Sequence, residues 1–428
     1  MKPKPIHFRL YFAILSLLLL SPRLITSVRA QQEICTQPFQ PVATPLTELG
    51  NNPYVRMDGQ TTTFTGGLYP DGNNTRPAQH EAAGLAEAAK IVPLNKKGQP
   101  DPQGSIVMLS IGMSNASSEF NNFMKLAHKN PEINPQLVLI NGAQGGQTAE
   151  KWVEPDSLSW QMAQAQLNRH SFTAEQVQVA WVKETLTRGG DFPIKTQTLE
   201  AYLEAIAHNL KINFPNIKIA YFSSRTRSYA YWRGISPEPV AYETGFAVKW
   251  LIEKQIKGDP ALNFDPARGE VKAPYLSWGP YLWIDGTNPR SDGRVWTAED
   301  MTADCTHPSP SGNQKVAEML MEFFMSDTLA ASWFPVGAHL PPTQPPTPIP
   351  TNVVAVTPTL VQPLTAVASL TPVPLALLTE QTSSTPVAGP TVTSASPAAN
   401  TRWMVYGVLI IASLGVGLAA SWFIFRRR

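Results

Sequence analysis

The fold of this chain is indicated by residues 105–115, which read Ser-Ile-Val-Met-Leu-Ser-Ile-Gly-Met-Ser-Asn. Residues 105–111 form a nearly continuous apolar run, which is typical of a strand buried on both faces of a parallel sheet. A tight turn follows, and residues 119–128 then continue as a predicted helix. A strand, a turn and a helix in this order would lift the hydroxyl of Ser114 above a sheet edge, beside the partial positive charge of a helix N-terminus. The plainer alternative is that Ser114 is only a turn residue or a helix N-cap, where serine is favoured in any case.

The remaining pattern predicts an α/β domain. Apolar runs at 136–140, 176–182 and 217–222 predict further strands, and an aromatic-rich stretch at 275–284 predicts a fifth. Helical patterns occur at 80–90, 198–213, 242–254 and 311–325. Strands that alternate with helices imply a parallel sheet, whose ligands bind beyond the carboxyl ends of the strands. Ser114, Gly146 and Lys183 each follow such a strand, so we expect them to share one site.

An acid and an imidazole stand close together late in the chain, in Asp304-Cys305-Thr306-His307-Pro308-Ser309. A histidine in this position could take a proton from a serine, while the carboxylate holds the tautomer of the imidazole. The alternative is a polar loop that leads into the next helix, with Ser309 or Ser311 as N-cap and His307 at the surface.

Two other loops carry candidate binding groups. Residues 141–148, Asn-Gly-Ala-Gln-Gly-Gly-Gln-Thr, follow the second strand, and glycines there let a backbone N–H approach an oxyanion closely. An ordinary turn is the alternative. Arg225 and Arg227 follow the fourth strand and could bind a carboxylate or sulfate, the alternative being solvated loop arginines. Trp278, Trp283 and Trp296 could stack on sugar rings, although core packing is their more common role.

Four blocks within residues 104–330 resemble the SGNH (GDSL-like) hydrolase superfamily. Residues 111–115 match its nucleophile turn, with Met113 in place of the usual aspartate before the serine, and residues 139–148 match its oxyanion block in the form found in sialate O-acetylesterases. Asp304 to Ser309 match the Asp-x-x-His-Pro signature. Residues 181–183, Trp-Val-Lys, depart from the pattern, because Lys183 stands where the family carries an amide.

The resemblance implies a three-layer α/β/α, flavodoxin-like fold and a serine esterase that needs no cofactor. Ser114, His307 and Asp304 would be nucleophile, base and orienting acid. The N–H groups of Ser114 and Gly146, with Lys183 as a further group, would hold the oxyanion. The expected substrate is an acetyl or other small acyl ester of a carbohydrate; the alternative is a decayed hydrolase fold that binds carbohydrate without turnover.

The ends of the chain predict export and anchoring. Residues 1–30 have a basic start and a short apolar core, as in a signal peptide. Residues 31–103 are interpreted as an irregular N-terminal extension that packs on the hydrolase-like domain at 104–335. A proline- and threonine-rich stalk (336–402) leads to a predicted transmembrane helix (403–425) and a basic cytoplasmic tail (426–428). The domain would then lie outside the cytoplasm, although a cleaved sorting signal has the same shape.

Charge and cysteine content bear on possible partners, metal sites and disulfides. The formal net charge of the 428 residues is +2, and no basic patch with interleaved aromatics occurs, so a nucleic-acid partner is not expected. No Cys/His cluster has zinc-ligand spacing. The chain has two cysteines, Cys35 and Cys305, which in an exported protein predict a disulfide. Two free thiols are the alternative.

Overall fold

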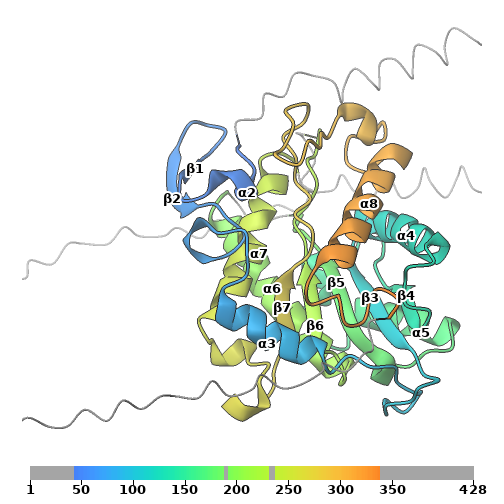
Figure 1. Ribbon diagram of the computed structural model, residues 1–428. Helices are drawn as coiled ribbons and strands as arrows, with labels where there is room; N and C mark the ends of the chain where they lie inside the picture. Colours follow the sequence, from blue (N-terminus) through green and yellow to red (C-terminus); the bar gives the residue numbers. More distant parts are fainter. Residues whose placement is uncertain (1–42, 188–190, 231–236, 338–428) are drawn as a thin grey trace, which may run out of the picture. The chain divides into compact units, whose positions relative to one another are not determined.

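The computed structural model describes residues 43–187, 191–230 and 237–337 (Figure 1). The predicted signal peptide, the transmembrane helix, the basic tail and all but the first two residues of the predicted stalk lie outside these ranges. Within them, no helix is long and apolar enough to cross a membrane. The expectations about both ends of the chain therefore stay predictions.

The domain is built on a parallel sheet of five strands, in the order β4-β3-β5-β6-β7. The strands are β3 (Ile106–Gly112), β4 (Leu137–Asn141), β5 (Val177–Lys183), β6 (Ile219–Phe222) and β7 (Tyr275–Trp278). If the five strands are numbered in their order along the chain, their order in the sheet is 2-1-3-4-5, as in flavodoxin-like folds. In this arrangement the direction in which successive strands are added reverses next to the first strand. The predicted α/β class with a parallel sheet is thus confirmed, and the carboxyl end of β3 lies at the point of reversal.

Strand boundaries agree with the sequence to within one or two residues except in β7. The aromatic stretch 275–284 predicted a longer strand, but β7 ends at Trp278. Gly279 and Pro280 follow, and proline has no N–H to donate to a sheet ladder. The chain beyond Trp278 therefore leaves the sheet, although Leu282, Trp283 and Ile284 remain fully buried.

Helices cover both faces of the sheet, which accounts for the apolar character of its strands. One face packs against α4 (Ser114–Lys129), α8 (Pro310–Ser326) and the end of α3 (Ala78–Ala88). The other packs against α5 (Leu158–Arg169), α6 (Ile194–Asn213) and α7 (Val240–Ile256). In Figure 1, α4 and α8 run side by side on their face of the sheet. Every residue of β3 is buried, as expected for a central strand between two helical layers.

The described part of the N-terminal extension packs into the main core, as expected, and holds more regular structure than the one helix predicted at 80–90. It contains α2 (Leu46–Leu49), the antiparallel hairpin of β1 (Pro53–Val55) and β2 (Thr61–Thr65), and α3. Leu46 is fully buried, and its amide donates to the Tyr281 hydroxyl at 3.1 Å. Tyr54 is also buried and donates to Glu243 of α7 at 3.1 Å. α2, β1 and β2 are too short to show periodicity, so only tertiary packing reveals their role. The helix expected at 80–90 is present as α3.

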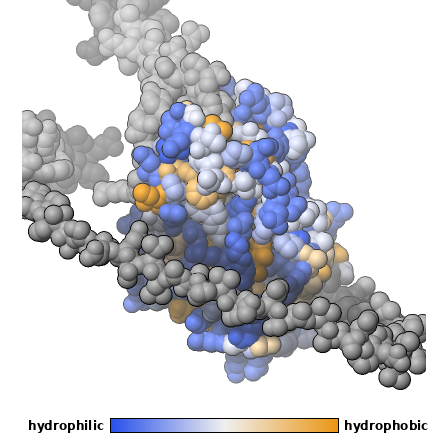
Figure 2. Space-filling model, turned by 90° about the vertical axis from the view of Figure 1, so that its left-hand side faces the viewer, coloured by the Kyte–Doolittle hydropathy of each residue, from blue (hydrophilic) through white to orange (hydrophobic). Residues whose placement is uncertain are grey.

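Figure 2 shows the side of the domain that carries β1 and β2. The described residues visible there are mostly hydrophilic, with small separate hydrophobic areas. Single exposed apolar residues such as Val55 are normal on a soluble surface.

We predict that Leu46→Ala destabilises the domain by about 2–5 kcal/mol, because it removes a fully buried side chain from the common core. Val55→Ala is the matched control, since Val55 lies in the same extension but is 41% exposed, and it should change the free energy of unfolding by less than about 0.5 kcal/mol. Urea unfolding measures both. Equal, small effects would mean that the extension is not part of the cooperative core.

Candidate active site

Ser114 stands at the carboxyl end of β3, as the first residue of α4. The turn that carries it is tight: a Cβ on Gly112 would lie 2.5 Å from the Lys183 carbonyl oxygen and 2.6 Å from the Cβ of Ala116. Only glycine fits between β5 and α4 at that point. The turn therefore places the Ser114 hydroxyl at the helix N-terminus, where backbone N–H groups have no intrahelical acceptor.

Ser114, His307 and Asp304 form one chain of hydrogen bonds. The Oγ of Ser114 lies 2.8 Å from Nε2 of His307, and Nδ1 of His307 lies 2.6 Å from Oδ2 of Asp304. The serine comes from the start of α4 and the other two residues from the loop before α8, where His307 stands 193 positions after Ser114. An imidazole held between a hydroxyl and a carboxylate can accept the hydroxyl proton at one nitrogen while the other nitrogen stays bonded to the acid.

Asp304 is kept ionised by its own loop. Partial burial raises the pKa of its carboxyl, but the bonds from the His307 amide, the His307 ring, the Thr306 amide and the Thr302 hydroxyl outweigh this and hold the pKa well below its usual range. Its Oδ1 accepts from both amides at 2.9 Å and from Thr302 at 2.8 Å. Hydrogen bonds to the charged form favour ionisation, so Asp304 can stabilise an imidazolium.

The acid–base loop is tied to the serine turn by Asn115, which sequence analysis did not single out. Its buried side-chain amide donates to the carbonyl oxygen of Thr306 at 2.9 Å. The loop is closed from within by the Thr302 amide, which donates to the His307 carbonyl at 2.8 Å. Asn115 directly follows Ser114 in sequence, but a buried side-chain-to-backbone bond across 191 positions has no sequence signal.

The loop also forms the helix entry that the alternative interpretation predicts. Ser309 is the N-cap of α8, and its hydroxyl accepts from the Gly312 amide at 3.4 Å. His307 is 45% exposed at its side chain, yet it contacts Ser114. The two interpretations are compatible, because capping the helix fixes the loop that presents the histidine.

The glycine block lies next to Ser114. The Gln144 amide donates to the Gly112 carbonyl at 2.8 Å, and a Cβ on Gly145 would lie 3.9 Å from the Cβ of Ser114. Gly146 has φ +74°, a conformation that favours glycine, and is exposed. In the described part of the chain, the amides of Gly145 and Gly146 donate to no protein acceptor. These N–H groups are thus available beside the serine, and Gly145 is the nearer residue.

The structure does not bring the Lys183 side chain to the open face of the site. Lys183 pairs in register with Gly112, so its backbone lies beside the serine turn. Its side chain is fully buried, and Nζ bonds both oxygens of Glu119 on α4 at 2.5 Å. Burial lowers the pKa of Lys183, and the charge of Glu119 opposes part of that shift. The ammonium is therefore engaged in an internal ion pair beneath the site.

Arg225 and Arg227 are both buried, so neither is a solvated loop arginine. Arg227 pairs with Asp285 at 3.0 Å and stacks over the ring of Tyr229. Arg225 forms no ion pair with any described residue. The tryptophans Trp278, Trp283 and Trp296 are 2% exposed or less and belong to the core rather than to a sugar-stacking surface.

Cys305 is fully buried in the acid–base loop and has φ +60°. No described cysteine is free. Its expected partner, Cys35, lies outside the described residues, so the predicted disulfide between them stays a prediction.

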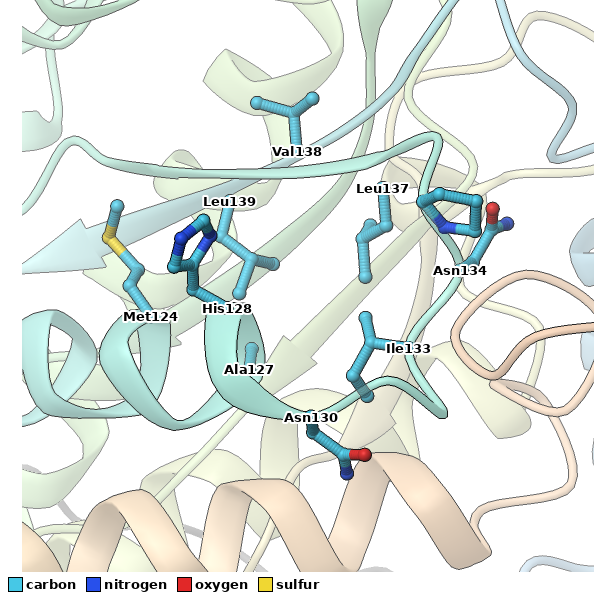
Figure 3. A pocket seen from close by; sticks show the side chains of 10 residues that line it. Met124, Ala127, His128, Asn130, Ile133, Asn134, Leu137, Val138 and Leu139 are labelled. Atoms are coloured by element: carbon cyan, nitrogen blue, oxygen red, sulfur yellow. The ribbon is translucent and has the colours of Figure 1, made fainter.

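One pocket lies apart from the serine site. Figure 3 shows a pocket between the C-terminal half of α4 and the amino end of β4, where Met124 and His128 face Leu137 and Leu139. His128 is 14 residues beyond Ser114 on α4, which is about 20 Å at 1.5 Å per residue, so this pocket is not part of the serine site. Among the described residues, no cluster of His, Cys, Asp or Glu has the arrangement of a metal site.

Comparison with known proteins adds little to this geometry. No family model matches the chain, and no curated protein matches it. One similar solved structure is a candidate acylhydrolase from Bacteroides fragilis, at 13% identity and a TM-score of 0.32, covering 60% of this chain and all of that one. Another is a salicylyl-acyltransferase from a tetracycline biosynthetic pathway, at 13% identity and a TM-score of 0.25, covering 53% of this chain and 56% of the other. At these TM-scores the likeness carries no argument, so the site rests on its own residues.

We predict that Glu119→Gln destabilises the domain by about 3–5 kcal/mol, because it leaves the buried ammonium of Lys183 without a counter-charge. The double variant Glu119→Leu with Lys183→Met removes both charges and should recover most of that loss. Urea unfolding of Glu119→Leu, of Lys183→Met and of the double variant gives the coupling energy. Additive losses would show that the pair does not interact as the geometry indicates.

Proposed function

We propose that this chain is a serine esterase that removes a small acyl group, such as acetyl, from a carbohydrate. The observation that carries the proposal is the hydrogen-bonded chain from Ser114 through His307 to Asp304, at 2.8 Å and 2.6 Å. Its members come from the two loops that the sequence pattern assigned to nucleophile and acid–base roles. The nucleophile lies at the carboxyl edge of a parallel sheet, beside the point of reversal where such folds bind ligands.

In the proposed reaction, Ser114 attacks the ester carbonyl as its proton passes to Nε2 of His307. The imidazolium is stabilised by Asp304, which accepts from Nδ1 and stays ionised. His307 then gives the proton to the departing alcohol. Water, activated by the same imidazole, hydrolyses the acyl-enzyme and restores the serine. No step requires a cofactor.

The oxyanion would be held by backbone groups. The Ser114 amide stands at the N-terminus of α4, and the free amides of Gly145 and Gly146 lie beside it. Donors fixed in place before the reaction stabilise developing charge without reorganisation. Because Lys183 is held by Glu119, the family's side-chain donor has no direct replacement at that position. We therefore assign the oxyanion to backbone amides. Lys183 lies beneath them in its ion pair with Glu119.

The carbohydrate substrate and the surface location depend on sequence alone. The glycine block resembles that of carbohydrate acetylesterases, and the end segments resemble a signal peptide and a C-terminal anchor. We propose an extracytoplasmic domain held at a membrane through residues 403–425.

We predict that a fluorophosphonate probe labels the full-length protein at Ser114, because the His307 contact activates that hydroxyl. Ser114→Ala should abolish both labelling and hydrolysis of 4-nitrophenyl acetate while retaining the wild-type unfolding curve. Ser117→Ala is the matched control, since Ser117 lies on the same helix without contact to His307, and it should still label. Peptide mapping after labelling identifies the modified residue. An unlabelled but folded wild-type protein would favour the carbohydrate-binding alternative.

We predict that His307→Ala lowers kcat by a factor on the order of 10⁵–10⁶ and Asp304→Asn by on the order of 10³–10⁴. Loss of the base removes proton transfer, whereas loss of the acid leaves a base with the wrong tautomer. Steady-state kinetics on 4-nitrophenyl acetate give the two ratios, and circular dichroism checks that each variant is folded. Small, equal losses in kcat would mean that the loop serves only to cap α8.

A further inference from the structure

Asn115 uses its side chain on the acid–base loop rather than on its own helix. It is the second residue of α4 and is 2% exposed, and its side-chain amide donates to the Thr306 carbonyl at 2.9 Å. An asparagine near a helix start commonly caps the helix, but the N-cap of α4 is Met113, and no side chain caps this helix. The Asn115 amide therefore joins two segments that are distant in sequence, and it does so directly beside Ser114.

This bond reaches the peptide group that immediately precedes His307. The Thr306 carbonyl and the His307 amide belong to one peptide unit, which is planar. Its oxygen accepts from Asn115 at 2.9 Å, and its N–H donates to Oδ1 of Asp304 at 2.9 Å. Two bonds at opposite ends of a rigid plane fix the orientation of that plane. The His307 carbonyl accepts from the Thr302 amide at 2.8 Å, so the backbone on both sides of the histidine is held.

Burial alone does not hold the imidazole of His307. Its side chain is 45% exposed, yet Nε2 lies 2.8 Å from Ser114 and Nδ1 lies 2.6 Å from Asp304. Between α4 and residues 302–308, the described part of the chain forms two hydrogen bonds, the Ser114–His307 contact and the Asn115–Thr306 bond. Only the second is independent of the reacting groups. It is the link that sets the distance between the helix of the nucleophile and the loop of the base.

The acid–base loop has other contacts that do not involve α4. The Cys305 carbonyl accepts from the Tyr229 amide at 3.2 Å and from the Ser228 hydroxyl at 3.4 Å. These bonds attach the loop to the segment that follows β6. Because they remain when Asn115 is changed, we expect loss of the Asn115 amide to displace the histidine without unfolding the domain.

We infer that Asn115 is a positioning residue, which keeps Nε2 of His307 within hydrogen-bond distance of Ser114 by holding the peptide between Thr306 and His307. The inference rests on the proposed esterase function and adds to it a residue that acts through the base. A displacement of reacting groups by about 1 Å lowers a rate by a factor on the order of 10². The loss should fall on kcat, because a buried residue that holds the base acts on the chemical step rather than on substrate binding.

The test is steady-state hydrolysis of 4-nitrophenyl acetate by the full-length protein and three variants. Asn115→Ala should lower kcat by about 10- to 100-fold and change KM by less than about threefold. Asn115→Asp keeps the size of the side chain but replaces the donating NH2 with an oxygen, so it should lose at least as much. Asn122→Ala is the matched control, because Asn122 lies on the same helix but donates to the Ser118 carbonyl within it. Its kcat should stay within about twofold of wild type.

A second measurement reports on the loop without any turnover. Hydrogen exchange of the full-length protein, followed by mass spectrometry, should be faster in peptides that cover residues 302–309 of Asn115→Ala and unchanged in Asn122→Ala. These peptides contain the His307 amide, which is bonded to Asp304 in the wild type. Urea unfolding of each variant shows whether the domain is folded under the conditions of both measurements.

The two measurements separate this inference from the esterase proposal. Folded wild-type protein that hydrolyses no ester, together with faster loop exchange in Asn115→Ala, would end the esterase proposal and keep Asn115 as the residue that holds the loop. Wild-type kcat in folded Asn115→Ala or Asn115→Asp, a change in KM alone, or unchanged loop exchange would overturn the role of Asn115 and leave the esterase proposal standing. If Asn115→Ala does not fold, Asn115→Asp decides in the same way.

Discussion

The structure depends on the position of β3 between β4 and β5. β3 pairs in parallel with both neighbours, and its last residue, Gly112, lies opposite Lys183. A side chain at Gly112 would collide with the Lys183 carbonyl, so the chain can turn here into α4 only with glycine. The Gly112 carbonyl also accepts from Gln144, which holds the glycine block against the turn. The carboxyl end of β3 therefore fixes the positions of Ser114, of the glycine-block amides and of Lys183 beneath them.

The acid–base loop completes the site through contacts with that strand end. Asn115 holds the Thr306 carbonyl, Ser309 caps α8, and Asp304 bonds the amides of its own loop. These contacts order the backbone around His307, because its own side chain is half exposed and is not held by packing alone. Fixed geometry of this kind is what acyl transfer requires, since proton transfer and oxyanion stabilisation both depend on groups placed before the substrate arrives.

Below this surface lies a layer of buried charge that is unusual for a domain core. Lys183 and Glu119 neutralise each other, whereas Arg225 has no partner among the described residues. Arg227, two residues further along the chain, pairs with Asp285.

Sequence alone determined the α/β class and the strand positions, because buried parallel strands are continuous apolar runs. It also indicated the two loops of the candidate site, because Ser114 and the Asp304–His307 pair stand in short local patterns. It did not reveal α2, β1 and β2 in the N-terminal extension, since these elements are too short to be periodic. Tertiary structure alone decided that Lys183 faces Glu119 and that no described residue bonds Nε or Nη1 of the buried Arg225. The direction of a long charged side chain depends on which groups the fold brings near it, and those groups lie far away in sequence.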